Sequence, residues 1–310
     1  MKAWLLLLLA TVVACAAGLW LGGAPDDFVL WQLRVPRVAM GWLVGATMGL
    51  AGAVYQCLFE NPLATPSTVG TTGGAALGAL AATVFLGPGT VAGLSVVIIA
   101  AFAGALGVTA IIALIAFGSR ARINDVLLAG IAISLAAGAL SSGIKFTADM
   151  ASTMQAVRWS LGNLAQVGYQ RVWLMLPFAL VAGVLMLGLT RELAALAGGE
   201  LKAQTQGVDV RRLRTLGLAA GSLGLGAAVA LCGPIAFVGL IVPHLVRGTL
   251  GASRHVLLPG SLIGGGAFLV ACDTLARVGL ADREIPVGVI TAGLGAPLIV
   301  WIVARQRNQA

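Results

Sequence analysis

Charged residues are scarce in this sequence, since Asp, Glu, Lys and Arg together make up only 10% of its 310 residues. An ordinary soluble domain carries about 25% charged residues. A soluble fold with so few charges would expose large apolar patches and aggregate. Hydrophobic residues make up 59% of the chain. The composition therefore excludes a soluble globular protein and predicts one that folds in lipid.

Motifs for catalysis and nucleotide binding are also missing. The sequence has no GxxxxGKS or GxxxxGKT phosphate loop, no HExxH zinc motif and no GxSxG nucleophile elbow. Its two histidines have no spacing that suggests a metal site, and its four cysteines lie in or beside apolar runs without a CxxC pair. The basic residues are spread singly through the loops, which argues against nucleic acid as a partner. We expect no catalytic residue, no metal and no cofactor in this chain.

Continuous apolar runs, such as Leu5–Leu21 and Val91–Phe117, exclude a membrane β-barrel, whose strands alternate. A spanning helix takes ~20 residues, so the chain has room for roughly ten. We predict an all-α polytopic membrane protein with one transmembrane domain over residues 1–310. The first run could instead be a cleaved signal peptide, but it is longer than the usual signal core. The predicted spans are 3–21, 37–58, 67–86, 91–117, 125–144, 172–190, 214–232, 235–248, 257–277 and 287–304.

The distribution of Lys and Arg predicts the orientation. If the N-terminus lies in the cytoplasm, twelve of the 19 basic residues fall inside and both termini are cytoplasmic. The other seven fall outside, which is more than topology alone predicts and suggests a function for some of them. Asp273 is the main acidic residue within a span, and we expect a pair with Arg277 one turn further on rather than the alternative, a transport site. The shortage of intramembrane acids argues against a proton-coupled carrier.

Two further features concern packing and partners. The 43 glycines include the series Gly41, Gly45 and Gly49, whose spacing predicts closely packed helices in lipid more readily than a dedicated dimer motif. The longest hydrophilic segment inside the cell covers about 191–214, and a loop of this length is usually functional or disordered. We interpret it as a docking surface. The residues by themselves thus indicate a multi-span transporter or channel without its own energy source.

Three segments resemble the FecCD-type permeases, and weaker matches join them along nearly the whole chain. The first runs from Leu33-Arg34-Val35-Pro36-Arg37 to Asn61-Pro62-Leu63-Ala64 and residues 73–78; the others are residues 233–244 and 284–297. The resemblance implies a permease subunit of an ATP-binding-cassette importer for cobalamin, iron-siderophore or haem, with cobalamin favoured. It implies a homodimer in the bacterial inner membrane. Two cytoplasmic ATPase subunits, which bind ATP and Mg, and an external substrate-binding protein would complete the importer.

The resemblance also implies roles for particular residues. Acidic residues of the binding protein would dock on Arg34, Arg37 and Arg277. The cytoplasmic gate would include Asn61, Leu63 and Asn124, although the family has small hydroxyl residues where Asn124 stands. Pro62 predicts a helix break at this gate whatever its role. The segment that transmits ATPase movement would include Gly199, Glu200, Gly207, Asp209 and Arg211.

Two other classes of protein stay open at this stage. A secondary transporter or channel would need no ATPase, and an intramembrane enzyme is a more remote alternative. Copurification of an ATPase would separate the importer from both of them.

Overall fold

The computed structural model describes residues 2–23, 26–65, 67–87, 89–91, 93–116, 123–164, 168–280 and 284–307. At residues 116, 123, 124 and 301–307 it describes the backbone alone. Helices make up most of the fold in these ranges, joined by two short π-helical segments and one small hairpin. The predicted all-α fold class is therefore confirmed.

In chain order the elements are α1 (Lys2–Trp20), η1 (Val29–Arg34), α2 (Val35–Leu58), α3 (Thr71–Ala81), η2 (Ala82–Leu86), β1 (Thr90–Val91), β2 (Leu94–Ser95), α4 (Val96–Ala116), α5 (Ile123–Thr147), α6 (Met150–Ser160), α7 (Tyr169–Gly188), α8 (Thr190–Leu196), α9 (Glu200–Thr205), α10 (Val210–Cys232), α11 (Val238–Thr249), α12 (Arg254–Val278) and α13 (Val287–Arg307).

Each predicted span overlaps one helix of this series or, for 67–86, α3 with η2. Among the described residues, seven helical segments are long and apolar enough to cross a membrane: α1, η1 with α2, α4, α5, α7, α10 and α12. The segment α3 with η2 and the described part of α13 are apolar but shorter, and α11 has 12 residues. The chain is thus a multi-pass membrane protein of about the predicted complexity.

One predicted boundary was wrong, and one helix was missed. The span expected from residue 91 begins only at Val96, because Thr90–Val91 and Leu94–Ser95 pair as strands β1 and β2. Gly87 and Gly93 have positive φ angles of 67° and 78°, which end the preceding helix and form the turn. Helix α6 was not predicted at all. Asp149 begins it, since its side chain accepts hydrogen bonds from the backbone N–H of Ala151 and Ser152, and hydrogen bonding with Ser152 lowers the pKa of its carboxyl group.

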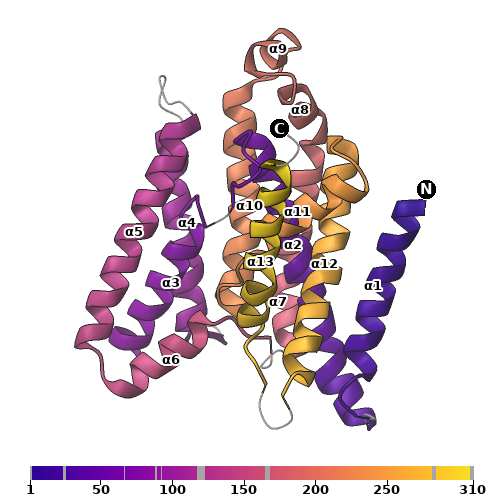
Figure 1. Cartoon of the computed structure of the whole chain (residues 1–310). Helices are drawn as coiled ribbons and strands as arrows, with labels where there is room; N and C mark the ends of the chain where they lie inside the picture. Colours follow the sequence, from indigo (N-terminus) through magenta and orange to yellow (C-terminus); the bar gives the residue numbers. More distant parts are fainter. Residues whose placement is uncertain are drawn as a thin grey trace.

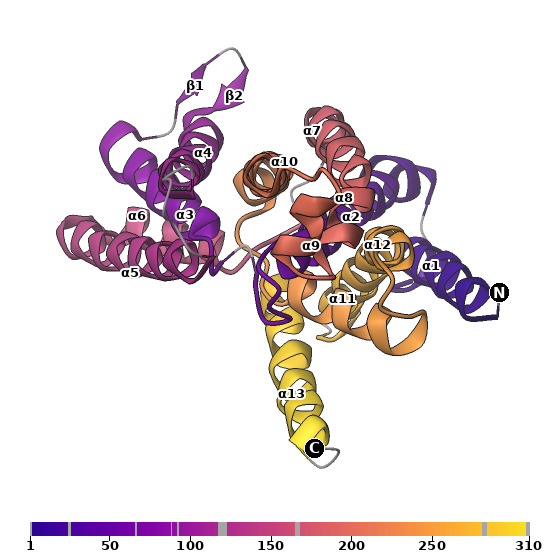
Figure 2. The same cartoon turned by 90° about the horizontal axis from the view of Figure 1, so that it is seen from above.

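The helices form two lobes (Figure 1). We call α3 to α6 the small lobe; the large lobe contains α1, α2 and α7 to α13. Helix α10 of the large lobe packs against α4 of the small lobe, where Gly226 lies against Ala105 and Phe102. Seen from above, α13 extends away from the rest of the large lobe (Figure 2).

Helix α2 lies at the centre of the large lobe and is buried along almost its whole length from Met40 to Leu58. Its glycines make this possible. A β-carbon on Gly45 would overlap the carbonyl group of Gly265 in α12, and one on Gly49 would overlap that of Ser261. Without side chains at these positions the two backbones can touch, which gives strong dispersion contacts in lipid. The predicted role of the glycine series in helix packing is confirmed.

Candidate functional site

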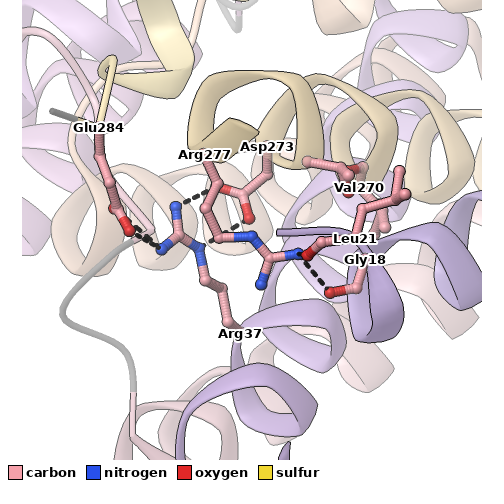
Figure 3. A network of polar contacts seen from close by, with 8 residues as sticks. Gly18, Leu21, Arg37, Val270, Asp273, Arg277 and Glu284 are labelled. Atoms are coloured by element: carbon pink, nitrogen blue, oxygen red, sulfur yellow. Dashed lines mark hydrogen bonds and ion pairs between the residues drawn. The ribbon is translucent and has the colours of Figure 1, made fainter. Parts of the chain in front are cut away.

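A buried ion-pair network lies at the end of the bundle where α1 is followed by α2 (Figure 3). Arg37, in the first turn of α2, forms a two-pronged pair with Asp273 of α12: Nε lies 2.8 Å from Oδ2 and Nη2 lies 2.9 Å from Oδ1. Its third nitrogen, Nη1, lies 3.0 Å from Oε2 of Glu284, just before α13. The side chains of Arg37 and Asp273 are only 10% and 9% exposed. The guanidinium group thus joins three separate parts of the chain.

The predicted pair between Asp273 and Arg277 is not formed, so that prediction was wrong. Both carboxylate oxygens of Asp273 accept from Arg37, because the close crossing of α2 and α12 brings that guanidinium to them. Arg277 instead donates from Nη2 to the carbonyl oxygens of Gly18, at 2.6 Å, and Leu21, at 3.1 Å. Those carbonyls lie at the C-terminal end of α1, where no intrahelical donor is available.

Arg34 also donates hydrogen bonds to carbonyl groups at the C-terminal end of α1. Its Nη1 donates to the carbonyl oxygen of Leu19 at 2.7 Å, and its Nη2 donates to those of Gly22 and Gly23 at 3.2 and 3.1 Å. Two cations at a helix C-terminus also interact favourably with the helix dipole. Arg34, just before α2, and Arg277, on α12, therefore fasten the end of α1, which is mostly exposed elsewhere, to the rest of the large lobe.

The structure brings the three arginines predicted for docking to one end of the molecule. However, Arg34 and Arg37 are each only 8% exposed, and their donors bind groups of this chain. In the structure these arginines hold parts of this chain together: Arg37 joins α2 to α12, and Arg34 and Arg277 hold the end of α1. Their contact with a binding protein stays a prediction.

The predicted helix break near Pro62 is confirmed. Helix α2 ends at Leu58, and Glu60 adopts a left-handed conformation with φ 47°. The side-chain oxygen Oδ1 of Asn61 then accepts a hydrogen bond from the backbone N–H of Leu63 at 2.9 Å. Such a turn is the usual use of asparagine where a chain leaves a helix. The side chain of Asn124, the third predicted gate residue, lies outside the described residues.

Replacing Asn61 by alanine should lower the free energy of unfolding by about 1 kcal/mol, because the N–H of Leu63 loses its acceptor. Asn61→Asp keeps an acceptor at the same place and should cost less. Unfolding by sodium dodecyl sulfate in mixed micelles would measure both changes. Equal losses in the two variants would contradict a role for the hydrogen bond.

A cavity of about 870 Å³ lies between the two lobes, and we call it the seam cavity. Leu63, Thr65 and Thr68 line it near the α2–α3 connection, and Ser160 and Leu161 line it at the end of α6. The first region lies halfway along α5, where the hydroxyl of Ser134 donates to the carbonyl oxygen of Ser67. The second lies beside Ser141 and Lys145, near the end of α5. Other walls come from α10 and from α13. The cavity therefore extends from the middle of the bundle toward one end.

Phe237 marks the wall of the seam cavity where α11 begins. Its φ angle of 67° is unusual for a residue with a bulky side chain. Its ring lies against Gly295 of α13, where an added β-carbon would be 2.5 Å from the ring. The sequence signalled neither this conformation nor the cavity, because the walls come from segments far apart in the chain.

The hydrophilic segment predicted for docking folds into α8 and α9, at the end of the molecule opposite the Arg37 ion-pair network (Figure 1). Gly199 and Gly207 have φ angles of 98° and 83°, which permit the turns on either side of α9. Glu200 pairs with Arg214 at 2.8 Å, and Asp209 begins α10 by accepting from the N–H of Arg212 at 3.0 Å. Arg211 lies in the first turn of α10.

Leu201 is the feature of this end that the sequence analysis missed. It lies on α9 and is 81% exposed, although its neighbours along the helix are polar. A single exposed aliphatic side chain does not by itself define an interface, so a contact of Leu201 with another protein stays a prediction. Its signal in the sequence was weak, because the position of a single leucine on a six-residue helix depends on how the chain turns.

The buried helix crossings, the long cavity between two lobes and the polar tip together define a helical membrane permease. Residues 4–305 match the FecCD transport family, so the chain belongs to that family. The resemblance drawn from the sequence motifs is thereby confirmed.

Individual relatives agree with this assignment. The chain is 38% identical to the vitamin B12 import system permease protein BtuC of Salmonella paratyphi A, over 97% of this chain and 93% of that one. It is 37% identical to the protein of the same name from Klebsiella pneumoniae, over 98% and 93%. A solved ABC transporter of the metal-chelate type, in an inward-facing conformation, matches with a TM-score of 0.89 and 30% identity over 98% of this chain and 99% of that one. PsaBC from Streptococcus pneumoniae, at 16% identity and a TM-score of 0.56 over 93% and 94% of the two chains, shares the fold alone.

Proposed function

We propose that this chain is the membrane-spanning permease subunit of an ATP-binding-cassette importer whose cargo is cobalamin. The observation that carries the proposal is the relationship to vitamin B12 import permeases along nearly the whole chain, at 38% identity. The chain would lie in the bacterial cytoplasmic membrane with both termini inside. Iron-siderophore or haem is the second candidate cargo, supported by the likeness to a metal-chelate type transporter.

The seam cavity would be one half of the translocation pathway, and a second copy of the chain would supply the other half. None of the described residues that line the cavity is charged; they are apolar, small or hydroxyl-bearing. Such walls bind a large cargo weakly, and a pathway must release what it admits. The cargo would thus pass without a strong binding site in the membrane.

The two ends of the bundle would take different partners. The α8–α9 tip would dock on one of two ATPase subunits, which hold ATP and Mg. The end with Arg34, Arg37 and Arg277 would face the substrate-binding protein. This chain would then need no catalytic group or cofactor of its own, since the energy comes from its partner.

Reconstitution in proteoliposomes with the ATPase and binding protein tests the proposal. Uptake of labelled cobalamin that requires ATP would support it. Uptake of a ferric siderophore or haem in place of cobalamin would keep the importer and change the cargo. Uptake by the chain alone, without either partner, would contradict the importer itself.

Replacing Leu201 by aspartate should reduce copurification of the ATPase at least about tenfold, because a desolvated apolar contact becomes a buried charge. The fold should be unchanged, since the side chain touches little of its own chain. Thr249→Asp, in the last turn of α11 and also exposed, lies outside the α8–α9 tip; it is the matched control and should copurify nearly as wild type. Equal loss in both variants would point to a general charge effect at this end.

A further inference from the structure

A second cavity, of about 640 Å³, lies on the other side of the contact between the lobes, and we call it the basic cavity. The small lobe contributes Thr83, Ser95, Gln155 and Arg158, and the large lobe contributes Arg171 with the end of α10. Figure 2 shows α4 and α7 on either side of α10, away from α13. The basic cavity thus has walls from both lobes and does not belong to the seam cavity, whose α10 residues are Leu225 and Val229.

Two guanidinium groups line this cavity without a counter-charge. Arg158 lies in the last turn of α6 and Arg171 in the first turn of α7. No carboxylate that the structure describes lies within 4.0 Å of either group, and none of the lining residues is acidic. Arg171 donates one hydrogen bond, from Nη1 to the carbonyl oxygen of Leu231 at 3.3 Å. Most of the ten guanidinium N–H donors therefore stay available to an anion.

The surroundings of the cavity place it where a membrane meets water. Trp159 lines it, and Trp173, which follows Arg171 on α7, is 67% exposed. Tryptophan is enriched at the level of lipid headgroups. Apolar surface continues from Trp173 along the outer face of α7, where Leu180, two turns further on, is 57% exposed. A ligand could thus have one end among arginines and the other along the apolar face of α7.

The floor of the cavity is apolar as well. Val97 and Ile98 line it at the start of α4. One turn deeper, the rings of Phe102 in α4 and Phe178 in α7 meet edge to face with their centroids 5.2 Å apart. This aromatic contact joins the lobes below the charged region. A soluble anion would use only the upper half of such a cavity, whereas an amphipathic anion would use both halves.

We propose that the basic cavity binds an anionic phospholipid, with its phosphate between Arg158 and Arg171 and its acyl chains against α4 and α7. Guanidinium groups suit this ligand, because they stay charged and donate paired hydrogen bonds to phosphate oxygens. The two arginines come from different lobes, so the bound phosphate joins the small lobe to the large lobe at the membrane surface.

Native mass spectrometry of the full chain in detergent, with added phosphatidylglycerol or phosphatidylcholine, tests the proposal. Wild type should retain phosphatidylglycerol in preference, and Arg158→Gln and Arg171→Gln should each lower its occupancy about tenfold, as expected for the loss of a charge-assisted contact. Lys145→Gln removes one positive charge near the same end of the bundle and should leave occupancy unchanged. The measurement needs neither ATPase nor cargo, so its result does not depend on transport.

Several outcomes would overturn the proposal. Equal retention of phosphatidylcholine would show that the site does not select an anionic headgroup. Displacement of phosphatidylglycerol by millimolar inorganic phosphate or glycerol phosphate would show that the site takes soluble anions. An equal loss in Lys145→Gln would reduce the effect to general surface charge. A thermal-stability measurement on each variant confirms that the protein is folded before its lipid occupancy is compared.

Discussion

Replacing Arg37 by methionine should lower the free energy of unfolding by about 3–5 kcal/mol, because it leaves Asp273 buried without its partner. The carboxylate of Asp273 now receives two hydrogen bonds from Arg37, at 2.8 and 2.9 Å, and its side chain is 9% exposed. No water can replace that pair without opening the contact between α2 and α12. Unfolding with sodium dodecyl sulfate in mixed micelles, followed by tryptophan fluorescence, would measure the loss.

The chain offers a matched control for this prediction. Arg214 and Glu200 form an ion pair with the same 2.8 Å separation, but Glu200 is 46% exposed. Arg214→Met should therefore cost only about 0–1 kcal/mol. The double variant Arg37→Met with Asp273→Leu removes both buried charges and should recover most of the stability. A double variant as unstable as Arg37→Met would show that the effect comes from shape and not from an unpaired carboxylate.

The sequence predicted those parts of the fold that depend on local chemistry. Long apolar runs gave the positions of the spans, and Pro62 gave the end of α2, since both signals act within a few residues. The glycine series in α2 predicted a close helix crossing for the same reason. Gly45 and Gly49 indicated which face of α2 would meet a neighbouring helix, although they did not indicate which helix that would be.

The candidate site was less predictable because its contacts are long-range. Arg37 and Asp273 lie 236 positions apart in the chain, whereas Arg277 lies one helical turn from Asp273 and is the partner that spacing alone predicts. Only the crossing of α2 and α12 decides between them. Arg34 and Arg277 donate to backbone carbonyls at and just after the end of α1. Every residue has a backbone carbonyl, so a sequence does not show which ones accept these bonds. The walls of both cavities likewise come from several helices, so no single sequence motif predicts either cavity.

Replacing Gly52 by alanine should lower the free energy of unfolding by about 3 kcal/mol or more, at the upper end of the usual cost of overpacking. Gly52 lies where α2 crosses the start of α11, and an added β-carbon would overlap the backbone of Gly239. A flexible side chain could rotate away, but a backbone cannot. Gln56 lies at the same crossing, and its Nε2 donates to the carbonyl oxygen of Gly239 at 3.2 Å. Separating the helices would break that bond too.

Gly183→Ala in α7 is the matched control, because nothing lies within 4 Å of an added β-carbon there. Alanine is favoured over glycine inside a helix by about 0.8–1.0 kcal/mol, so this variant should be as stable as wild type or more stable. The yield of folded protein and its unfolding in detergent would be compared for both. A stable Gly52→Ala variant would mean that α11 can move away from α2 at little cost. The start of α11, with Phe237 on the wall of the seam cavity, would then be a movable part of the cavity and not a fixed one.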